Sequence, residues 1–227
     1  MRQRTTFLRA VAAIATKDLR AELRNRQLIA AMGLFGLLTT MVFYYTLESR
    51  PDVRLAALPA VLWVTVVFAG TQGVGRNLAQ EHDRGTLDGL LLAPINRAAL
   101  FYGKLVVAWL FAFTVAAVVS VALNFLFNTN LFRPAWWLVV LLGTLGFAAI
   151  GTLLGSMAVY ARGRETTLPI IVLPIALPVI VAAVNASNAI LTDRPFAELG
   201  SWLGLLAALD VVFLTLALIL FDFIVEE

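Results

Sequence analysis

The sequence predicts an all-α polytopic membrane protein with six transmembrane helices and an amphipathic interfacial helix at its N-terminus. Of its 227 residues, 61% are hydrophobic and only 14% are charged. A soluble domain of this size needs more charge to cover its surface. The apolar residues also come in long blocks, and at about 20 residues per crossing plus connections the chain accommodates roughly six spans.

The N-terminal segment, residues 1–28, is basic and amphipathic. Its apolar positions recur at three- and four-residue spacing, the period of one helical face, and they are Leu8, Val11, Ala15, Leu19 and Leu23. The polar face carries Arg9, Thr16, Lys17, Arg20 and Arg24. Such a helix can lie in the headgroup layer with its apolar face down, or it can pack on a partner. The segment lacks the small-residue cleavage site of a signal peptide, so we expect it to be retained.

Six apolar blocks follow, and each is long enough to cross a bilayer. The expected spans are 29–47, 55–75, 105–127, 135–161, 166–192 and 199–221. Asn128, Asn130, Arg133 and Pro134 predict the turn between the third and fourth spans.

Lysine and arginine predict the orientation of these spans. With the N-terminus inside, 13 of the 17 basic residues lie in inside segments, and only Arg50, Arg54, Arg133 and Arg194 lie outside. Both termini are therefore expected in the cytoplasm. Trp136, Trp137 and Trp202 would begin spans at the outer interface, as aromatic belts do. The outer loops (48–54, 128–134 and 192–198) are short, so the polar mass faces the cytoplasm.

The one substantial polar connection, residues 76–97, reads RNLAQEHDRGTLDGLLLAPINR. Apolar and polar residues alternate in a way that predicts a short helix with two faces, loosened by Gly85 and Gly89 and ended by Pro94. On the residues alone, this is either a plain interfacial loop helix or a contact site for a cytoplasmic partner.

This connection resembles the cytoplasmic loop of ABC-2-type permeases, the type V exporter-like group. In that group an acidic residue precedes Gly-Thr-Leu, a leucine-rich run and a proline, which here are Glu81, Gly85-Thr86-Leu87, Leu90-Leu91-Leu92 and Pro94. The resemblance implies that 29–227 form the permease domain and that the loop is a coupling helix seated in a groove of a separate ATPase. The residues it assigns to coupling are Glu81, His82, Asp83, Arg84, Gly85, Thr86, Leu87, Leu91 and Pro94.

Within that group, the whole chain resembles the CcmB family. The shared segments include 17–24 (KDLRAELR), 58–64 (LPAVLWV), Gly103-Lys104-Leu105 with Trp109, Leu142-Gly143-Thr144, and Val172-Leu173-Pro174 with Pro178. The pattern departs at Ala108, where family members often have histidine. The resemblance implies a multi-pass subunit in the bacterial inner membrane that serves cytochrome c maturation. It would couple ATP hydrolysis on a CcmA-like subunit to haem export, or to release of a haem-loaded periplasmic chaperone (CcmE-like), alongside CcmC-like and CcmD-like membrane subunits.

The sequence carries no nucleotide-binding chemistry of its own. The phosphate-cradling pattern G-x-x-x-x-G-K-[ST] is absent, because Ala98 stands at the first glycine position before Gly103-Lys104 and Leu105 follows. We therefore expect a non-catalytic chain whose ATP binds on a partner. There is no cysteine, and the single histidine, His82, lies in the cytoplasmic loop, where a contact role is expected rather than iron ligation.

The outer half of the chain is expected to be a poor haem site. Its possible iron ligands are Met32 or Met41 and the pair Tyr44–Tyr45. We therefore expect no bound metal or cofactor in this chain, with haem handled by other subunits of the complex.

Two features inside the spans remain open. Asp210 is an intramembrane acid that should face protein or water, either as a functional or partner contact or hydrogen bonded to Asn124, Asn185 or Asn188. Pro169, Pro174 and Pro178 each remove a backbone donor from the fifth span, which predicts either a fixed kink or a hinge.

Three other classes of function are alternatives to the CcmB interpretation. The first is an ABC-2-type exporter of another substrate, such as a lipid-linked glycan or a drug. A channel or secondary transporter would need several intramembrane charges, and a scaffold would not need the coupling pattern. Whether two copies pair with each other or one copy pairs with a different membrane subunit stays open.

Overall fold

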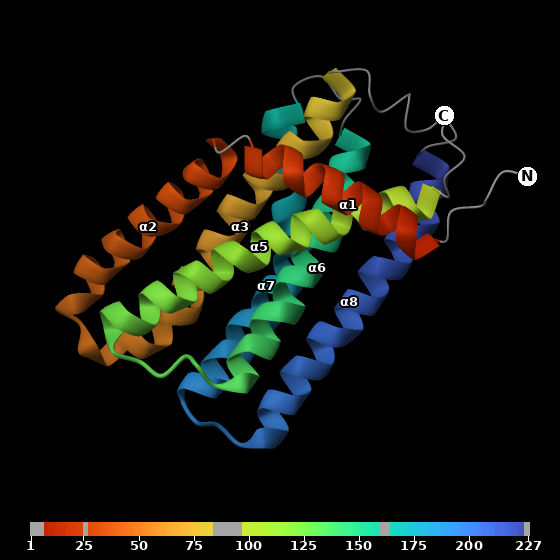
Figure 1. Ribbon diagram of the computed structural model, residues 1–227. Helices are drawn as coiled ribbons and strands as arrows, with labels where there is room; N and C mark the ends of the chain where they lie inside the picture. The colour runs from red at the N-terminus through yellow and green to blue at the C-terminus, as the bar shows by residue number, and fades with distance from the viewer. Residues whose placement is uncertain (1–6, 25–26, 84–96, 159–163, 225–227) are drawn as a thin grey trace, which may run out of the picture.

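The computed structural model describes residues 7–24, 27–83, 97–158 and 164–224, and every regular element in these ranges is an α-helix. In chain order the helices are α1 (Phe7–Arg24), α2 (Gln27–Glu48), α3 (Pro51–Asp83), α5 (Arg97–Phe127), α6 (Pro134–Ala158), α7 (Arg164–Leu191) and α8 (Phe196–Ile224). Figure 1 shows them as a bundle of long helices crossed on one flank by α1.

Six of these helices are long and apolar enough to cross a membrane, which confirms the predicted fold class. The candidate spans are Ala30–Glu48, Val53–Gly73, Ala98–Phe127, Pro134–Met157, Leu168–Leu191 and Phe196–Leu220. Their connections at one end of the bundle are short, and they turn where polar residues interrupt the apolar blocks. Asn128 and Asp193 both take a φ of 50° there, a left-handed conformation that Asn and Asp tolerate better than most residues.

The second and third spans are longer helices than the sequence predicted. The loop was expected to begin at residue 76, but α3 continues to Asp83, and α5 begins at Arg97 rather than at 105. With 33 residues, α3 is about 50 Å long, well beyond the roughly 30 Å of a bilayer's hydrocarbon core. Hydropathy locates the edge of the apolar block, whereas a helix continues past that edge until a breaker such as Gly85 follows.

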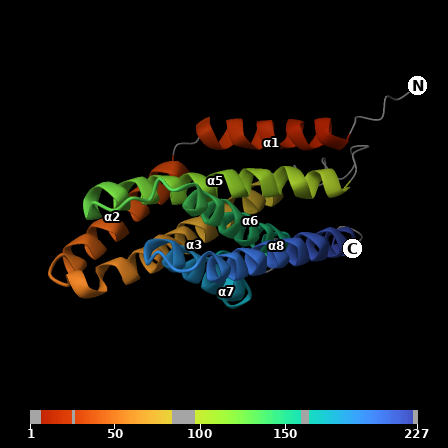
Figure 2. The same cartoon turned by 90° about the horizontal axis from the view of Figure 1, so that it is seen from below.

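The span α6 lies at the centre of the bundle. It packs on α3, α5, α7 and α8, and it is the most buried span, whereas α8 is the least buried. In Figures 1 and 2, α2 and α8 lie at opposite margins of the bundle. One wall of the molecule is thus α8, whose exposed side carries large apolar residues such as Val211, Val212 and Ile219.

Trp136 corrects one expectation about the aromatic belt. It does begin a span, but its side chain is fully buried, and its indole Nε1 donates a hydrogen bond to Ser120 Oγ at 3.1 Å. Trp137 and Trp202 are half-buried. A tryptophan at a span end satisfies its N–H equally well in a headgroup layer or against a buried hydroxyl, and the sequence did not distinguish the two.

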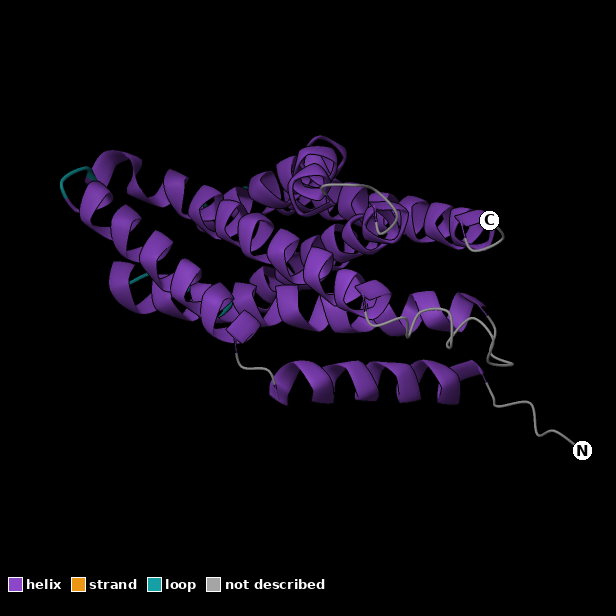
Figure 3. Cartoon of the chain, turned by 90° about the horizontal axis from the view of Figure 1, so that it is seen from above, coloured by secondary structure: helices purple, strands orange, loops and turns teal. Residues whose placement is uncertain are grey.

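The helix α1 lies outside the bundle and packs along α5. Figures 2 and 3 both show it as a separate rod on the flank of the bundle. In Figure 1 it runs obliquely over α5. This placement puts the N-terminal helix against the first turns of the helix that follows the predicted coupling segment.

Candidate functional site

The predicted coupling segment begins in the last turn of α3 and continues into the connection to α5. Glu81, His82 and Asp83 form the last helical residues of α3. The remaining assigned residues lie outside the described part of the chain, namely Arg84, Gly85, Thr86, Leu87, Leu91 and Pro94. Their coupling role stays a prediction, and the structure defines instead what is attached to the two helices that flank the segment.

The helix after the segment, α5, is joined closely to α1. A methyl group added at Gly103 would lie 2.6 Å from Ile14 Cγ2 and 3.4 Å from the carbonyl oxygen of Val11. Only a residue without a β-carbon lets the two helices approach this closely. About two turns earlier in α1, the rings of Phe7 and Tyr102 meet edge to face with centroids 5.9 Å apart. The contact therefore extends along several turns of α1.

A buried ion pair lies within this contact. Lys104 Nζ lies 2.8 Å from Asp18 Oδ2, and the two side chains are only 4% and 5% exposed. Lys17 Nζ approaches the other carboxylate oxygen of Asp18 at 3.2 Å from the exposed side. Glu22, one turn further along α1, is also buried. Taking two charges out of water is costly, so a buried pair holds only where both partners are in place.

The face of α1 that packs on the bundle differs from the predicted apolar face. The buried positions are Ala10, Ile14, Asp18 and Glu22, whereas Leu8 and Leu23 are exposed. The helix thus has three sectors rather than two: a packed face with acids, an apolar flank and a basic outer face. The signal was present in the sequence as an i, i+4 series, but Asp18 and Glu22 belong to neither of the two predicted faces.

The helix before the segment, α3, contacts the centre of the bundle through its own residue Trp63. Its indole lies so close to Gly143 of α6 that a methyl group there would overlap the ring. Its Nε1 donates a hydrogen bond to Ser187 Oγ of α7 at 3.1 Å. Trp63 is fully buried. One side chain therefore joins α3 to both α6 and α7.

Asp210 lies in the interior, and the hydrogen bonds expected for it are not formed. It is 3% exposed, and a methyl group at Gly146 of α6 would overlap its Oδ1. Among the described residues, neither carboxylate oxygen has a hydrogen-bond partner.

The three asparagines proposed as partners of Asp210 do not bond it. Asn124 accepts a hydrogen bond from the Leu131 backbone N–H at 2.9 Å, and Asn185 donates one to the carbonyl of Val181 at 2.8 Å. The side-chain oxygen of Asn188 has no partner among the described residues. The expectation was wrong for Asn124 and Asn185 because their side chains bond instead to backbone groups close by in sequence.

The prolines of the fifth span lie within one continuous helix, α7. Pro174 and Pro178 are exposed, whereas Val172, Ala176 and Val179 face the core. Each proline has no N–H for the carbonyl four residues earlier in the helix. Because Pro174 and Pro178 are exposed, these gaps in the hydrogen bonding lie on the side of α7 that faces away from the core. A hinge role for Pro169, Pro174 and Pro178 stays a prediction.

Met32 lies apart from the other possible iron ligands, Met41, Tyr44 and Tyr45, which lie close together near the far end of α2. Met32 is buried five residues after the start of α2, at the end of the bundle opposite the short connections, so placing it in the outer half was wrong. Met41 is 41% exposed. Tyr44 packs edge to face on Phe127 and Tyr45. No group of three His, Cys, Asp or Glu residues that could hold a metal occurs in the described part of the chain.

The fold defines a class of protein: the described part of the chain is helical, and six of its helices can cross a membrane. The two helices on either side of the polar connection each contact other helices, α5 through Lys104–Asp18 and α3 through Trp63–Ser187. The profile of the family described as "CcmB protein" matches residues 9–225. The chain belongs to this family of membrane permeases, as its sequence resemblance predicted.

Three relatives share the name "Heme exporter protein B". The protein from Bradyrhizobium diazoefficiens is 26% identical over 212 residues, covering 91% of this chain and 93% of the relative. Those from Rhodobacter capsulatus and Pseudomonas aeruginosa are 26% and 25% identical, each covering 74% of this chain and 78% and 77% of the relative. The similarity therefore extends over most of both chains rather than over a single motif.

Proposed function

We propose that this chain is the membrane permease subunit of an ATP-driven haem export system for cytochrome c maturation. In this proposal, ATP is hydrolysed on a separate ATPase subunit. The permease couples that hydrolysis to haem export or to release of a haem-loaded periplasmic chaperone. The observation that carries the proposal is the family match over residues 9–225, together with relatives named as haem exporters that align over most of their length.

The mechanical arrangement of the helices supports a coupling role. A cytoplasmic ATPase that moves the 84–96 segment would move the end of α3 and the start of α5 first. The α5 end is joined to α1 through Gly103–Ile14 and Lys104–Asp18, and the α3 helix is joined to α6 and α7 through Trp63. Displacement at one segment would thus reach both the flank and the centre of the bundle, as helix shifts do in switching proteins.

The proposal assigns haem to the complex and treats it as cargo rather than as a cofactor of this chain. The chain contains no cysteine and a single histidine, His82, in the polar connection. Met32 and the Tyr44–Tyr45 pair lie far apart along α2, about 18 Å for 12 residues of helix. Haem ligation is therefore proposed for the other membrane subunits and the periplasmic chaperone.

The decisive test is to weaken the predicted contact with the ATPase. Leu87 and Leu91 are four residues apart and share one helical face, so they are the best apolar anchors for a groove. Replacing both by alanine should release the ATPase, because truncating a buried anchor commonly costs more than about 2 kcal/mol, or roughly 30-fold in affinity. We would purify the complex in mild detergent and measure bound ATPase, ATP turnover and cytochrome c maturation.

Two further variants complete this test. Glu81→Arg should weaken docking or separate ATP turnover from maturation, because charges at the rim of a contact set its register. Asn130→Ala, at the opposite end of the bundle, should change neither. If the double leucine variant keeps its ATPase and full maturation activity, the coupling assignment is wrong. A complementation experiment tests the substrate: the unaltered chain is expressed in cells that lack their own haem exporter protein B. If the leucine variants lose the ATPase but the unaltered chain does not restore cytochrome c maturation in these cells, the chain exports a different substrate.

A further inference from the structure

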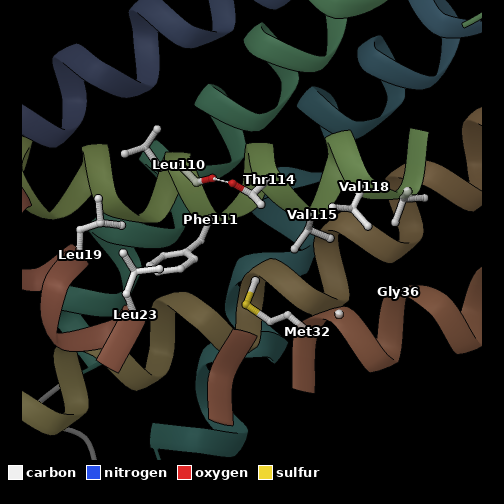
Figure 4. A pocket seen from close by; sticks show the side chains of 11 residues that line it. Leu19, Leu23, Met32, Gly36, Leu110, Phe111, Thr114, Val115 and Val118 are labelled. Carbon is white, nitrogen blue, oxygen red and sulfur yellow. Dashed lines mark hydrogen bonds between the residues drawn. The ribbon is translucent and has the colours of Figure 1, made fainter. Parts of the chain in front are cut away.

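A cleft of about 250 Å³ lies between α1, α2 and α5. Leu19 and Leu23 of α1 border it at one end, and Met32, Gly33 and Gly36 of α2 form part of its wall. Figure 4 shows the side chains of Leu23, Phe111 and Met32 directed into the same space. Leu23 and Val118 are about half exposed, so the cleft opens to the outside of the bundle, where lipid surrounds a membrane protein.

The lining of this cleft is almost entirely apolar. Its one hydroxyl belongs to Thr114, which donates a hydrogen bond to the carbonyl oxygen of Leu110 at 2.7 Å. That donor is therefore already used. The glycines of α2 leave room where side chains would otherwise stand: a β-carbon on Gly33 would meet no atom within 4 Å. The space suits a flexible hydrocarbon chain, and its volume of about 250 Å³ is small for a whole partner helix, which is about 10 Å across with its side chains.

Unpaired positive charge lies beside this apolar space. Arg20 and Arg24 each follow a cleft leucine in sequence, are four residues apart and are both exposed. Neither forms an ion pair or hydrogen bond with another described residue. This differs from the packed face of α1, where Asp18 is paired with Lys104. The basic and apolar sectors of α1 are thus adjacent, as in helices that lie in an anionic lipid surface.

We propose that this cleft binds one anionic phospholipid, with an acyl chain between α1, α2 and α5 and the phosphate on Arg20 and Arg24. The lipid would fill the space between α1 and the first span. It would also hold α1 in the headgroup layer beside the Asp18–Lys104 pair. A zwitterionic lipid could place a chain in the same cleft, but its headgroup would bring no net negative charge to the two arginines.

The test uses the full chain, purified in mild detergent with any subunits that accompany it and placed in nanodiscs. Phosphatidylglycerol and phosphatidylcholine carrying the same photoactivatable acyl chain serve as probes, and mass spectrometry maps the labelled residues. Phosphatidylglycerol should label the cleft segments of α1, α2 and α5 several-fold more than phosphatidylcholine does. Arg20→Gln with Arg24→Gln should lower phosphatidylglycerol labelling several-fold, to the level of phosphatidylcholine, since each arginine near a membrane surface contributes up to about 5-fold to anionic lipid binding.

A cleft-filling variant tests the hydrocarbon half of the site. Gly33→Leu should abolish labelling in the cleft by occupying the space. The matched control is Gly204→Leu on α8, where an added β-carbon also meets no atom within 4 Å, and this variant should label normally. If Gly33→Leu fails to fold, as judged by its elution and melting, the Arg20→Gln/Arg24→Gln variant tests the proposal by itself. Equal labelling by the two lipids, labelling that survives a folded Gly33→Leu, or cross-links to a protein segment in the cleft would each overturn the proposal.

Discussion

Asp18 of α1 and Asp210 of α8 are aspartates buried to the same degree, 5% and 3% exposed, yet their surroundings are opposite. Asp18 lies against Lys104 and Lys17. Asp210 lies against Gly146 and has no hydrogen-bond partner among the described residues. Asp18 therefore serves as part of a joint between two helices, whereas Asp210 lowers stability without forming a contact that compensates.

This difference separates a structural acid from a candidate functional one. An intramembrane acid is costly and marks a functional site more often than a structural one. Asp18 has a structural explanation in its partner, and Asp210 does not. Burial alone therefore does not distinguish the two roles, but the presence of a counter-charge does.

The largest effect is expected from breaking the pair. Lys104→Ala leaves Asp18 buried with the half-exposed Lys17 as its described counter-charge, and removing one partner of a buried pair costs about 3–5 kcal/mol. The melting temperature of the purified chain should fall accordingly. The control is the double variant Asp18→Leu with Lys104→Met, which removes both charges and should recover most of the loss. A single variant that melts like the unaltered chain would show that the pair does not hold α1.

A smaller effect is expected at the glycine beside Asp210. Gly146→Ala places a methyl group against Asp210 Oδ1 and near Val179, and overpacking of this kind typically costs about 1–3 kcal/mol. In a background carrying Asp210→Ala, the same glycine change should cost much less. A double-mutant cycle of melting free energies measures this coupling. Additive effects would place the carboxylate away from α6.

The smallest effect on stability is expected at Asp210 itself. Asp210→Asn removes a charge that has no counter-charge among the described residues, so stability should change by less than about 1 kcal/mol or rise, in contrast to the large loss expected for Lys104→Ala. Cytochrome c maturation is measured beside the melt. Loss of maturation with assembly intact would show that the charge is used in function. A loss of stability as large as that of Lys104→Ala would mean that Asp210 has a partner after all.

Single cysteines determine which end of the bundle faces the outside of the cell, and therefore the side of the membrane on which the Asp18–Lys104 pair lies. The chain contains no cysteine, so each introduced thiol is the only one labelled. Cysteines at Asp52, Asn130 and Asp193 should react with an impermeant reagent on intact cells, and cysteines at Ala10, Asp88 and Arg162 should not. The opposite pattern would invert the topology and place the Asp18–Lys104 joint on the outer side.

The sequence alone was sufficient to predict the number of spans and the positions of their turns. Spans that cross a bilayer are apolar blocks of about 20 residues, separated by short polar interruptions. Both features can be recognised in a single sequence. The turn at Asn128, with its φ of 50°, is one such interruption. The coupling segment was predicted from its pattern of residue types, because Gly-Thr-Leu and Pro94 are local in sequence, and its role stays a prediction.

The tertiary structure decided which side of each helix faces protein. Lipid and a protein interior are both apolar, so hydropathy cannot tell them apart. Trp136 therefore looked like an interfacial residue but is buried against Ser120. Asp18 and Lys104 are 86 positions apart in sequence, and only the crossing of α1 over α5 at Gly103 brings their charges together. Such pairing depends on how helices cross in space, and the periodicity of residues within one helix does not predict it.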